Sequence, residues 1–393
     1  MNLDCYALGA LPIKKLKGTE PDESLDLAQK GLRVASAIVI ASLISDNGGL
    51  TSLDLSNNAL CGVVQSFGEG GTYTAEGIKA IADALRVNGA LTRVDVRFNK
   101  IAGDGAAQLS AAVLGNLKFD MFNKIPIKKM RADSFTELDL KAKYIGVEGA
   151  MVVAGLIPVM GALTVANLLG NDLDAESAKM LVQVAKQKGI SLCGIQRDQT
   201  TADFSSQGLL PPDAILLASD LSQAVITGAL TNMSLACNML DEEGTKAICK
   251  ALKHNKTLKE LDLSGFVRSN IGGAAGAKHV ADMLGVNSGL TVTNLLGNQL
   301  DAESAKLLAE VAKQKGISLC GIQRDQTIAE FSRQYLHKRL LPPDAILLAS
   351  DLSQAVVTGA LTECDLRANK MGEEGKSSIR NAVQGKAGFE LHL

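Results

Sequence analysis

The chain has 393 residues, 46% of them apolar, which is enough material for a large buried core. Its 40 basic and 42 acidic residues leave a formal net charge of −2, so charge gives no case for a nucleic-acid partner or an anionic membrane surface. The chain has no tryptophan and only four tyrosines, and therefore lacks the usual material of a surface that stacks bases.

The seven cysteines are scattered and include no C-x-x-C pair. This favours reduced thiols in a cytoplasmic protein over a disulfide framework or a zinc site. The start of the chain carries the early acid Asp4 and no apolar stretch, so we expect no secretory signal. Residues 149–171 are uncharged and long enough to span a bilayer, but Gly155, Pro158 and Gly161 interrupt them. We expect repeat core there, with a helix, a turn and a strand.

A leucine frame recurs along the chain. Residues 50–60 fit L-x-x-L-x-L-x-x-N-x-L, with Leu53 and Leu55 at alternate positions and Asn58 after them. Alternate residues of a strand face the same side, so these leucines should face the core and the residues between them the open side. One unit alone cannot bury its apolar face, so the repeats must stack. The frame begins near residues 22, 50, 91, 135, 163, 230, 258, 290 and 361.

Each strand is followed by two further signals. The asparagine after the strand should be buried, where its amide satisfies backbone groups of neighbouring coils. A helical stretch comes next, as in residues 103–114 and 241–255, with apolar residues at helical spacing after an acidic or glycine-rich start.

A longer duplication overlies the repeats, because residues 163–204 return nearly unchanged at 290–331. Within the two copies, residues 188–195 and 315–322 predict an additional degenerate strand. We expect an N-terminal cap over 1–21, repeats over 22–387 and a C-terminal cap strand over 388–393. Residues 1–393 are thus predicted to be one solenoid domain with about a dozen parallel strands in a single curved sheet.

The frame, its spacing of 28 residues and the acid/Gly-Gly-Ala-x-x-Leu helix resemble leucine-rich repeats of the ribonuclease-inhibitor type. That class includes the repeat domains of NOD-like receptors and of Ran GTPase-activating proteins. The resemblance covers about residues 20–393 and implies an α/β horseshoe with a parallel β-sheet on the concave face and helices on the convex face. Ala166 and Thr293 depart from it, because leucine is usual at their positions. The class is defined by its scaffold, so the resemblance says little about function.

The outward positions of the strands form the expected binding surface. Aspartate recurs at the middle position beside basic residues, which predicts a concave face for a basic or mixed-charge protein partner. The alternative is that a polar strand face only keeps the protein soluble. The charged positions are Asp54, Arg93, Asp95, Arg97, Glu137, Asp139, Lys141, Glu260, Asp262, Glu363, Asp365 and Arg367.

The two duplicated strands differ from the others in their outward positions. Val165 and Leu169 in the first copy, and Val292 and Leu296 in the second, would face outward and form an apolar contact patch. The alternative is a shift of register that buries them.

We find no catalytic, metal-binding or cofactor-binding pattern: the four histidines lack metal-ligand spacing, and G-x-S-x-G, H-E-x-x-H and a phosphate-binding loop do not occur. We therefore expect a non-enzymatic scaffold that binds a protein of unknown identity through its concave face, without nucleic acid or membrane. By resemblance to the Ran activators, an activator of a small GTPase that presents Arg268 is an alternative. A structural subunit of a larger assembly is another.

Overall fold

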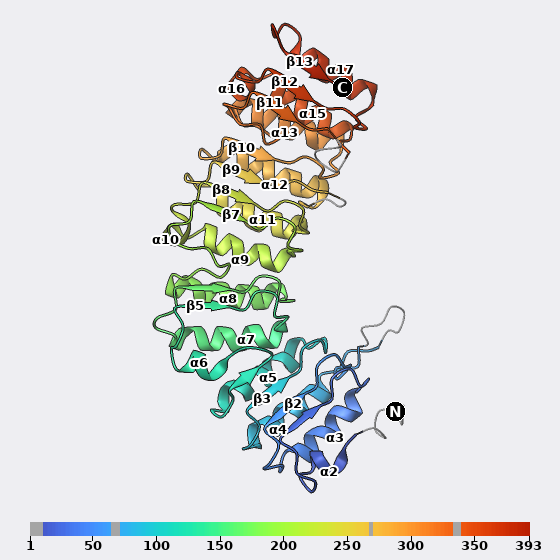
Figure 1. The fold of residues 1–393 in the computed structure, drawn as a ribbon, viewed down its shortest axis with the longest axis vertical. Helices are drawn as coiled ribbons and strands as arrows, with labels where there is room; N and C mark the ends of the chain where they lie inside the picture. Colours follow the sequence, from blue (N-terminus) through green and yellow to red (C-terminus); the bar gives the residue numbers. More distant parts are fainter. Residues whose placement is uncertain (1–10, 64–70, 267–269, 333–338) are drawn as a thin grey trace. The chain divides into compact units, whose positions relative to one another are not determined.

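The computed structural model describes residues 11–63, 71–266, 270–332 and 339–393. Short strands and helices alternate along the whole chain, and the residues form two compact units that divide between Gly194 and Ile195 (Figure 1). The α/β leucine-rich-repeat fold expected from the sequence is confirmed. One continuous solenoid domain over residues 1–393 stays a prediction.

The described residues of the first unit form six strands. They are β1 (Ser24–Asp26), β2 (Ser52–Asp54), β3 (Arg93–Asp95), β4 (Met121–Phe122), β5 (Glu137–Asp139) and β6 (Val165–Asn167). Its helices are α2 (Ile13–Leu16), α3 (Val34–Ile44), α4 (Glu76–Val87), α5 (Gly103–Gly115), α6 (Ile127–Arg131), α7 (Gly146–Leu156), the 3-10 turn η1 (Ile157–Val159) and α8 (Ala175–Lys188).

In the second unit, seven strands lie in the part of the chain that the structure describes. They are β7 (Thr201–Asp203), β8 (Asn232–Ser234), β9 (Glu260–Asp262), β10 (Val292–Asn294), β11 (Ile328–Glu330), β12 (Glu363–Asp365) and β13 (Glu390–His392). Its helices are α9 (Pro211–Leu221), α10 (Ala224–Thr227), α11 (Asp241–Leu252), α12 (Gly273–Val286), α13 (Ala302–Lys315), α15 (Pro342–Leu352), α16 (Ala355–Thr358) and α17 (Gly372–Val383).

The strands pair in parallel with their equivalent positions opposite one another, as in Leu53 beside Val94 and Met233 beside Leu261. This register keeps the leucine positions in line, so the central residue of β1–β3 and of β5–β12 is buried. The helices of successive repeats pack on one another beside the strands, as α9, α11 and α12 do in Figure 1. Residues 149–171 form part of α7, η1 and β6, as expected for repeat core.

The buried asparagines join successive coils. Asn238 is 4% exposed, and its Oδ1 accepts the backbone N–H groups of Gln207 and Leu209 at 3.1 and 3.0 Å. Its Nδ2 donates to the carbonyls of Phe204 and Leu235, each at 2.9 Å. These backbone groups lie in turns with no strand partner, so the side chain supplies the hydrogen bonds that burial demands. The same role is played by Asn58, Asn99, Asn171, Asn298 and Asn369.

A second set of asparagines lies after the helices. Asn88 donates through Nδ2 to the carbonyls of Ile44 and Asn47, and its Oδ1 accepts the N–H groups of Ala90 and Leu91. It therefore joins the ends of two successive helices to the start of the next strand. Asn47 and Asn287 make the equivalent bonds. This set was not predicted from the sequence, although N-x-x-L precedes four of the strands at Asn47, Asn88, Asn255 and Asn287.

The glycine near the start of several helices lets neighbouring helices approach closely. A Cβ added at Gly244 in α11 would lie 2.9 Å from the Ala214 Cβ in α9, and one at Gly375 in α17 would lie 2.8 Å from the Ala345 Cβ. Such contacts are too short for real carbon atoms, so a larger residue would push the helices apart.

The prediction of a single curved sheet is wrong within each unit. In the first unit the hydrogen-bonded ladder stops between β4 and β5, and in the second it stops between β10 and β11. Beside β10 the expected strand at 315–322 forms only isolated bridges at Ser318 and Cys320, and it occupies the edge where the next strand would pair. At 188–195 the equivalent bridges fall at Ser191 and Cys193. β13 pairs with β12, as expected of residues 388–393.

A buried carboxyl group lies at the interruption between β4 and β5. Glu148 in α7 is 3% exposed, and its Oε1 accepts a hydrogen bond from Asn123 Nδ2 at 2.8 Å. Burial raises the pKa of Glu148 to about 8, because the charged form loses its hydration there. Glu148 is therefore mostly protonated at neutral pH in the folded protein.

We predict that replacing Asn238 by alanine lowers the free energy of unfolding by on the order of 3 kcal/mol, because several buried backbone groups lose their partners. Urea denaturation measures the change. Asn232→Ala is the matched control, because Asn232 is only half-buried and its Oδ1 accepts one local bond from the Thr231 hydroxyl. Equal destabilisation by the two variants would contradict the role assigned to Asn238.

Glu148 should make stability depend on pH. The unfolded chain ionises this group near its ordinary pKa of 4.5, whereas the folded chain holds the proton up to about pH 8. Stability should therefore fall as pH rises between these values, by on the order of a few kcal/mol. Glu148→Gln should remove this loss in urea denaturation at about pH 6 and about pH 9. Glu176→Gln, at an exposed position, is the control and should keep the fall in stability with rising pH. If Glu148→Gln keeps this fall as well, the role assigned to Glu148 is wrong.

Candidate functional site

The recurring aspartates of the strand face have a structural role that sequence analysis did not identify. In Asp262 the Oδ1 atom accepts the backbone N–H of Ser264 at 2.8 Å, which closes a turn directly after β9. Asn167 and Asn294 occupy the same position and make longer bonds of the same kind, at 3.4 and 3.2 Å. The turn therefore accounts for an acceptor at this position, and it leaves the second carboxylate oxygen for other contacts. The same bond is made by Asp26, Asp54, Asp95, Asp139, Asp203 and Asp365.

Two of the predicted acidic positions are neutralised by an arginine two residues later. Arg97 contacts both carboxylate oxygens of Asp95, and Arg367 does the same with Asp365. The hydrogen bond from Arg367 lowers the pKa of Asp365, which is 3% exposed. These pairs are local salt bridges, so the two aspartates offer little charge to a partner.

The charged positions predicted for the binding surface are exposed to solvent to different degrees. Exposed positions are Arg93, Glu137, Asp139 and Arg367, and half-buried positions are Asp54, Arg97, Lys141, Glu260, Asp262 and Glu363. In the first unit, Arg93 and Lys124 share a hollow of about 240 Å³ with Asp54 and Asp95, so the charges there are mixed.

The prediction of an apolar contact patch on the duplicated strands is wrong. Val165 and Leu169 are 6% and 0% exposed, and Val292 and Leu296 are 4% and 1% exposed. The cause is the segment that runs beside each of these strands. In the second unit it lies at residues 317–322, where the carbonyls of Ser318 and Leu319 accept the N–H groups of Thr293 and Leu295. The residues are buried, but by this segment and not by the shift of register that was the alternative, because Val292 still lies opposite Glu260 and Val165 opposite Glu137.

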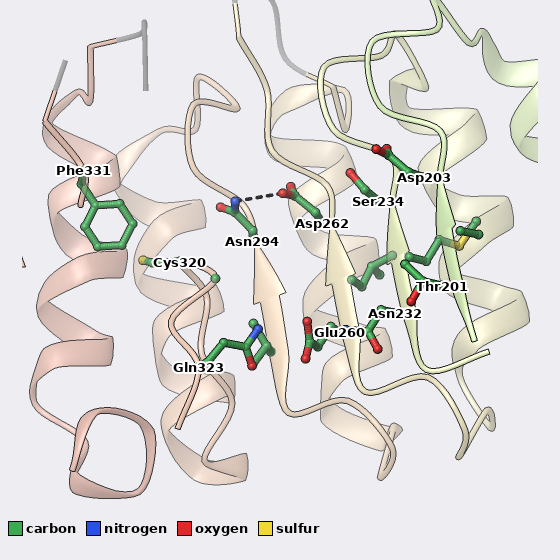
Figure 2. Close-up of a pocket in the computed structure, with 15 residues that line it drawn as sticks. Thr201, Asp203, Asn232, Ser234, Glu260, Asp262, Asn294, Cys320, Gln323 and Phe331 are labelled. Carbon is green, nitrogen blue, oxygen red and sulfur yellow. Dashed lines mark hydrogen bonds between the residues drawn. The ribbon is translucent and has the colours of Figure 1, made fainter. Parts of the chain in front are cut away.

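The strand face of β7–β10 is hollowed into a pocket of about 410 Å³. Figure 2 shows two rows of polar side chains, with Asp203, Ser234, Asp262 and Asn294 near one end of the strands and Thr201, Asn232 and Glu260 near the other. Val292, Cys320 and Phe331 add apolar surface beside β10. We call this hollow the acidic pocket, because the described residues that line it include three carboxylates and no lysine, arginine or histidine.

The carboxylates of the acidic pocket are available as acceptors. The N–H of Ser205 lowers the pKa of Asp203, which keeps this group ionised at neutral pH. Asp262 Oδ2 accepts one bond from Asn294 Nδ2 at 3.2 Å, drawn as a dashed line in Figure 2. No ion pair holds Asp203, Glu260 or Asp262 within the described residues. The pocket therefore suits a cationic group whose apolar part lies against Val292 and Phe331.

The β7 side of this pocket was not predicted from the sequence. Thr201 and Asp203 were not recognised because Ala202 and Phe204 replace the two leucines of the frame. A spacing signal was present, since Phe204 and Leu209 are five residues apart, as are Leu55 and Leu60. Three of the residues predicted to form the binding surface line this pocket, namely Glu260, Asp262 and Val292.

Arg268, the residue considered for GTPase activation, lies outside the described residues. Among the helices that the structure describes, none combines the length and the apolarity that crossing a bilayer requires.

Comparison with known proteins supports the repeat class. The chain is 28% identical to mouse ribonuclease inhibitor over 238 residues, which cover 55% of this chain and 51% of the inhibitor. It is 30% identical over 135 residues to human NACHT, LRR and PYD domains-containing protein 13, covering 31% of this chain and 12% of that protein. The matches thus span about half or less of these relatives. No model of a known protein family matches the chain.

Among solved structures, the leucine-rich repeat-containing protein LegL7 from Legionella pneumophila aligns with 89% of this chain and 95% of its own, at 17% identity and a TM-score of only 0.28. The repeat register and the sequence relatives together define the class. The chain has an α/β leucine-rich-repeat fold and resembles proteins of the ribonuclease-inhibitor type. Its repeats are similar to those of ribonuclease inhibitor and of the NACHT-LRR proteins.

The two roles of Asp262 can be separated. Asp262→Asn keeps an Oδ1 acceptor for Ser264, so we predict a free energy of unfolding close to that of the unaltered protein. Asp262→Ala removes the acceptor and should cost about 1 kcal/mol. Urea denaturation of the two variants compares them, and an equal loss in both would show that charge, rather than the turn, stabilises this position.

Proposed function

We propose that this protein is a non-enzymatic recognition scaffold whose strand faces bind a protein partner. The acidic pocket is the part of the surface that carries the proposal, and a lysine or arginine side chain of the partner is the group that it suits. The partner is a protein rather than a nucleic acid or a membrane, because phosphate groups would be repelled by Asp203, Glu260 and Asp262.

The supporting observation is an imbalance of charge on one sheet. Three carboxylates line the pocket without a basic neighbour among the lining residues, although the chain as a whole is nearly neutral. Asp203 lies in β7 and the other two carboxylates lie in β9, so like charges repel one another on one sheet, and the turn role requires an acceptor only at Asp203 and Asp262. Glu260 has no such role at the start of β9. A cationic group of the partner would offset the repulsion between the carboxylates, and this role would account for a glutamate at position 260.

The relatives are consistent with this proposal. One of them is by name an inhibitor of a ribonuclease, so its own role is carried out on another protein. The polar residues of the acidic pocket include no histidine, and its cysteine, Cys320, is 2% exposed with a pKa raised far above the ordinary value by burial. A buried neutral thiol is a poor nucleophile, and the pocket is therefore better suited to binding than to catalysis.

Removing the three charges should weaken partner binding. We predict that the triple variant Asp203→Asn/Glu260→Gln/Asp262→Asn retains at least tenfold less of its partner. The amides keep the turns and the shape of the pocket but cannot pair with a cation. The measurement is quantitative mass spectrometry of proteins retained by the full chain from its native source. Binding to the unaltered protein should also weaken as salt rises.

The matched control is Glu243→Gln/Glu303→Gln/Glu310→Gln, which removes the same charge from exposed helix positions of the second unit. This control should retain every partner. If both triple variants retain the same proteins in the same amounts, the proposed role of the acidic pocket is wrong.

A further inference from the structure

The first unit carries a cluster of aromatic and basic side chains in the two loops that follow β3 and β5. The rings of Phe98 and Tyr144 lie 5.3 Å apart at an interplanar angle of 45°. The Arg97 guanidinium lies 5.7 Å from the centre of the Phe98 ring and donates to the Lys143 carbonyl at 2.8 Å. Arg97 thus joins the two loops, while its charge is already paired with Asp95.

The two loops meet because the coil between them is short. β4 has two residues, and the chain turns back at once through bonds between Phe122 and Ile125. Asn123 then bridges the neighbouring coils directly, since its Oδ1 accepts the Val96 N–H and its Nδ2 donates to the Ile145 carbonyl. The interruption of the sheet after β4 is therefore what brings the two aromatic rings together.

Both aromatic residues have unfavourable backbone conformations. Phe98 has φ of +59° and Tyr144 has φ of +55°, in the left-handed region that bulky side chains rarely adopt. The same positions have positive φ in other repeats, which place Asn57 or Ala142 at the position of Phe98 and Gly31 or Lys100 at the position of Tyr144, and none of these residues is aromatic. Tyr144 is also 45% exposed, so folding gains little from its ring. Neither stability nor backbone geometry explains why aromatic residues occupy these two positions.

Unpaired lysines accompany the two rings. Lys100 shares the first loop, Lys141 and Lys143 share the second, and Lys124 lies in the turn between them. Lys100, Lys124 and Lys143 are exposed and Lys141 is half-buried. None of the four has a carboxylate within ion-pair distance in the part of the chain that the structure describes.

We propose that Phe98, Tyr144, Lys100, Lys124, Lys141 and Lys143 form a second protein-binding surface, which takes an acidic peptide segment with an apolar side chain. The lysines attract the carboxylates of the peptide, and Tyr144 supplies the amphipathic anchor that is typical of interface hot spots. This surface is opposite in charge to the acidic pocket, and its existence does not depend on the proposed function of that pocket.

A peptide fits this cluster better than a nucleic acid does. Bases stack on flat, open ring faces, whereas Phe98 and Tyr144 are tilted against each other and Arg97 covers Phe98. The basic residues are also confined to the two loops and the turn between them, rather than following a groove along which a phosphate backbone could run.

The test is fluorescence anisotropy of the full chain with a short fluorescein-labelled peptide of repeated Glu-Glu-Leu, at low and at moderate salt. Tyr144→Gly should bind the peptide roughly tenfold more weakly while its melting temperature stays the same or rises, because glycine relieves the left-handed conformation. Lys100→Glu/Lys143→Glu should abolish binding. A merely structural role for Tyr144 would instead lower the melting temperature and leave affinity unchanged.

The matched control is Lys256→Glu/Lys278→Glu, which makes the same change of charge at exposed positions of the second unit and should leave binding intact. A labelled single-stranded oligonucleotide is the competing probe. The proposal is overturned if the unaltered protein does not bind the peptide, if the control loses binding equally, or if the oligonucleotide binds more tightly and is lost in the same variants.

Discussion

The fold depends on hydrogen bonds from asparagine side chains to backbone groups that no sheet or helix satisfies. A leucine-rich coil turns sharply after the strand, so some of its buried N–H and C=O groups find no backbone partner. One amide such as Asn238 offers two donors and two acceptor positions, and thus serves the turn of its own coil and of the coil before. The second set, at Asn47, Asn88 and Asn287, does the same at the opposite end of the strands. Leucines supply the apolar core, and the asparagines fix how one coil follows the next.

The strand faces inherit their chemistry from this scaffold. The turn directly after most of the strands uses a side-chain acceptor at the last strand position, and aspartate supplies it while projecting a carboxylate outward. Neighbouring side chains then decide what the face offers. Arg97 and Arg367 neutralise their aspartates, whereas Asp203 and Asp262 keep their charge and join Glu260 in the acidic pocket. Where the ladder is interrupted after β4, the loops instead bring Phe98 and Tyr144 together. Differences between repeats thus create local sites on a regular frame.

Much of the fold could be predicted from the sequence, because leucine spacing follows from the geometry of a strand. The buried positions of Leu53 and Leu261 and the role of Asn58 were predicted correctly. The predictions failed at strands where small residues replace leucine, as at Ala202. They also failed where a segment that lacks the leucine frame covers a strand, as residues 317–322 cover Val292. The register of a strand alone could not predict this burial, because burial also depends on the segment that lies beside the strand. The pocket was only half predicted, since its second half comes from β7, which was not recognised. Its cationic partner and the concave-face role of the other charged positions stay predictions.

Hydrogen exchange at single-residue resolution can measure whether the asparagine side chains protect the turns between coils. The N–H groups of Gln207 and Leu209 lie outside helices and strands, and the Asn238 side chain is their acceptor. If such asparagines hold the coils together, these two amides should be protected as strongly as the paired amides of β8, and they should open with them in one cooperative step. Exchange at the rate of an unprotected loop, while β8 stays protected, would contradict the account.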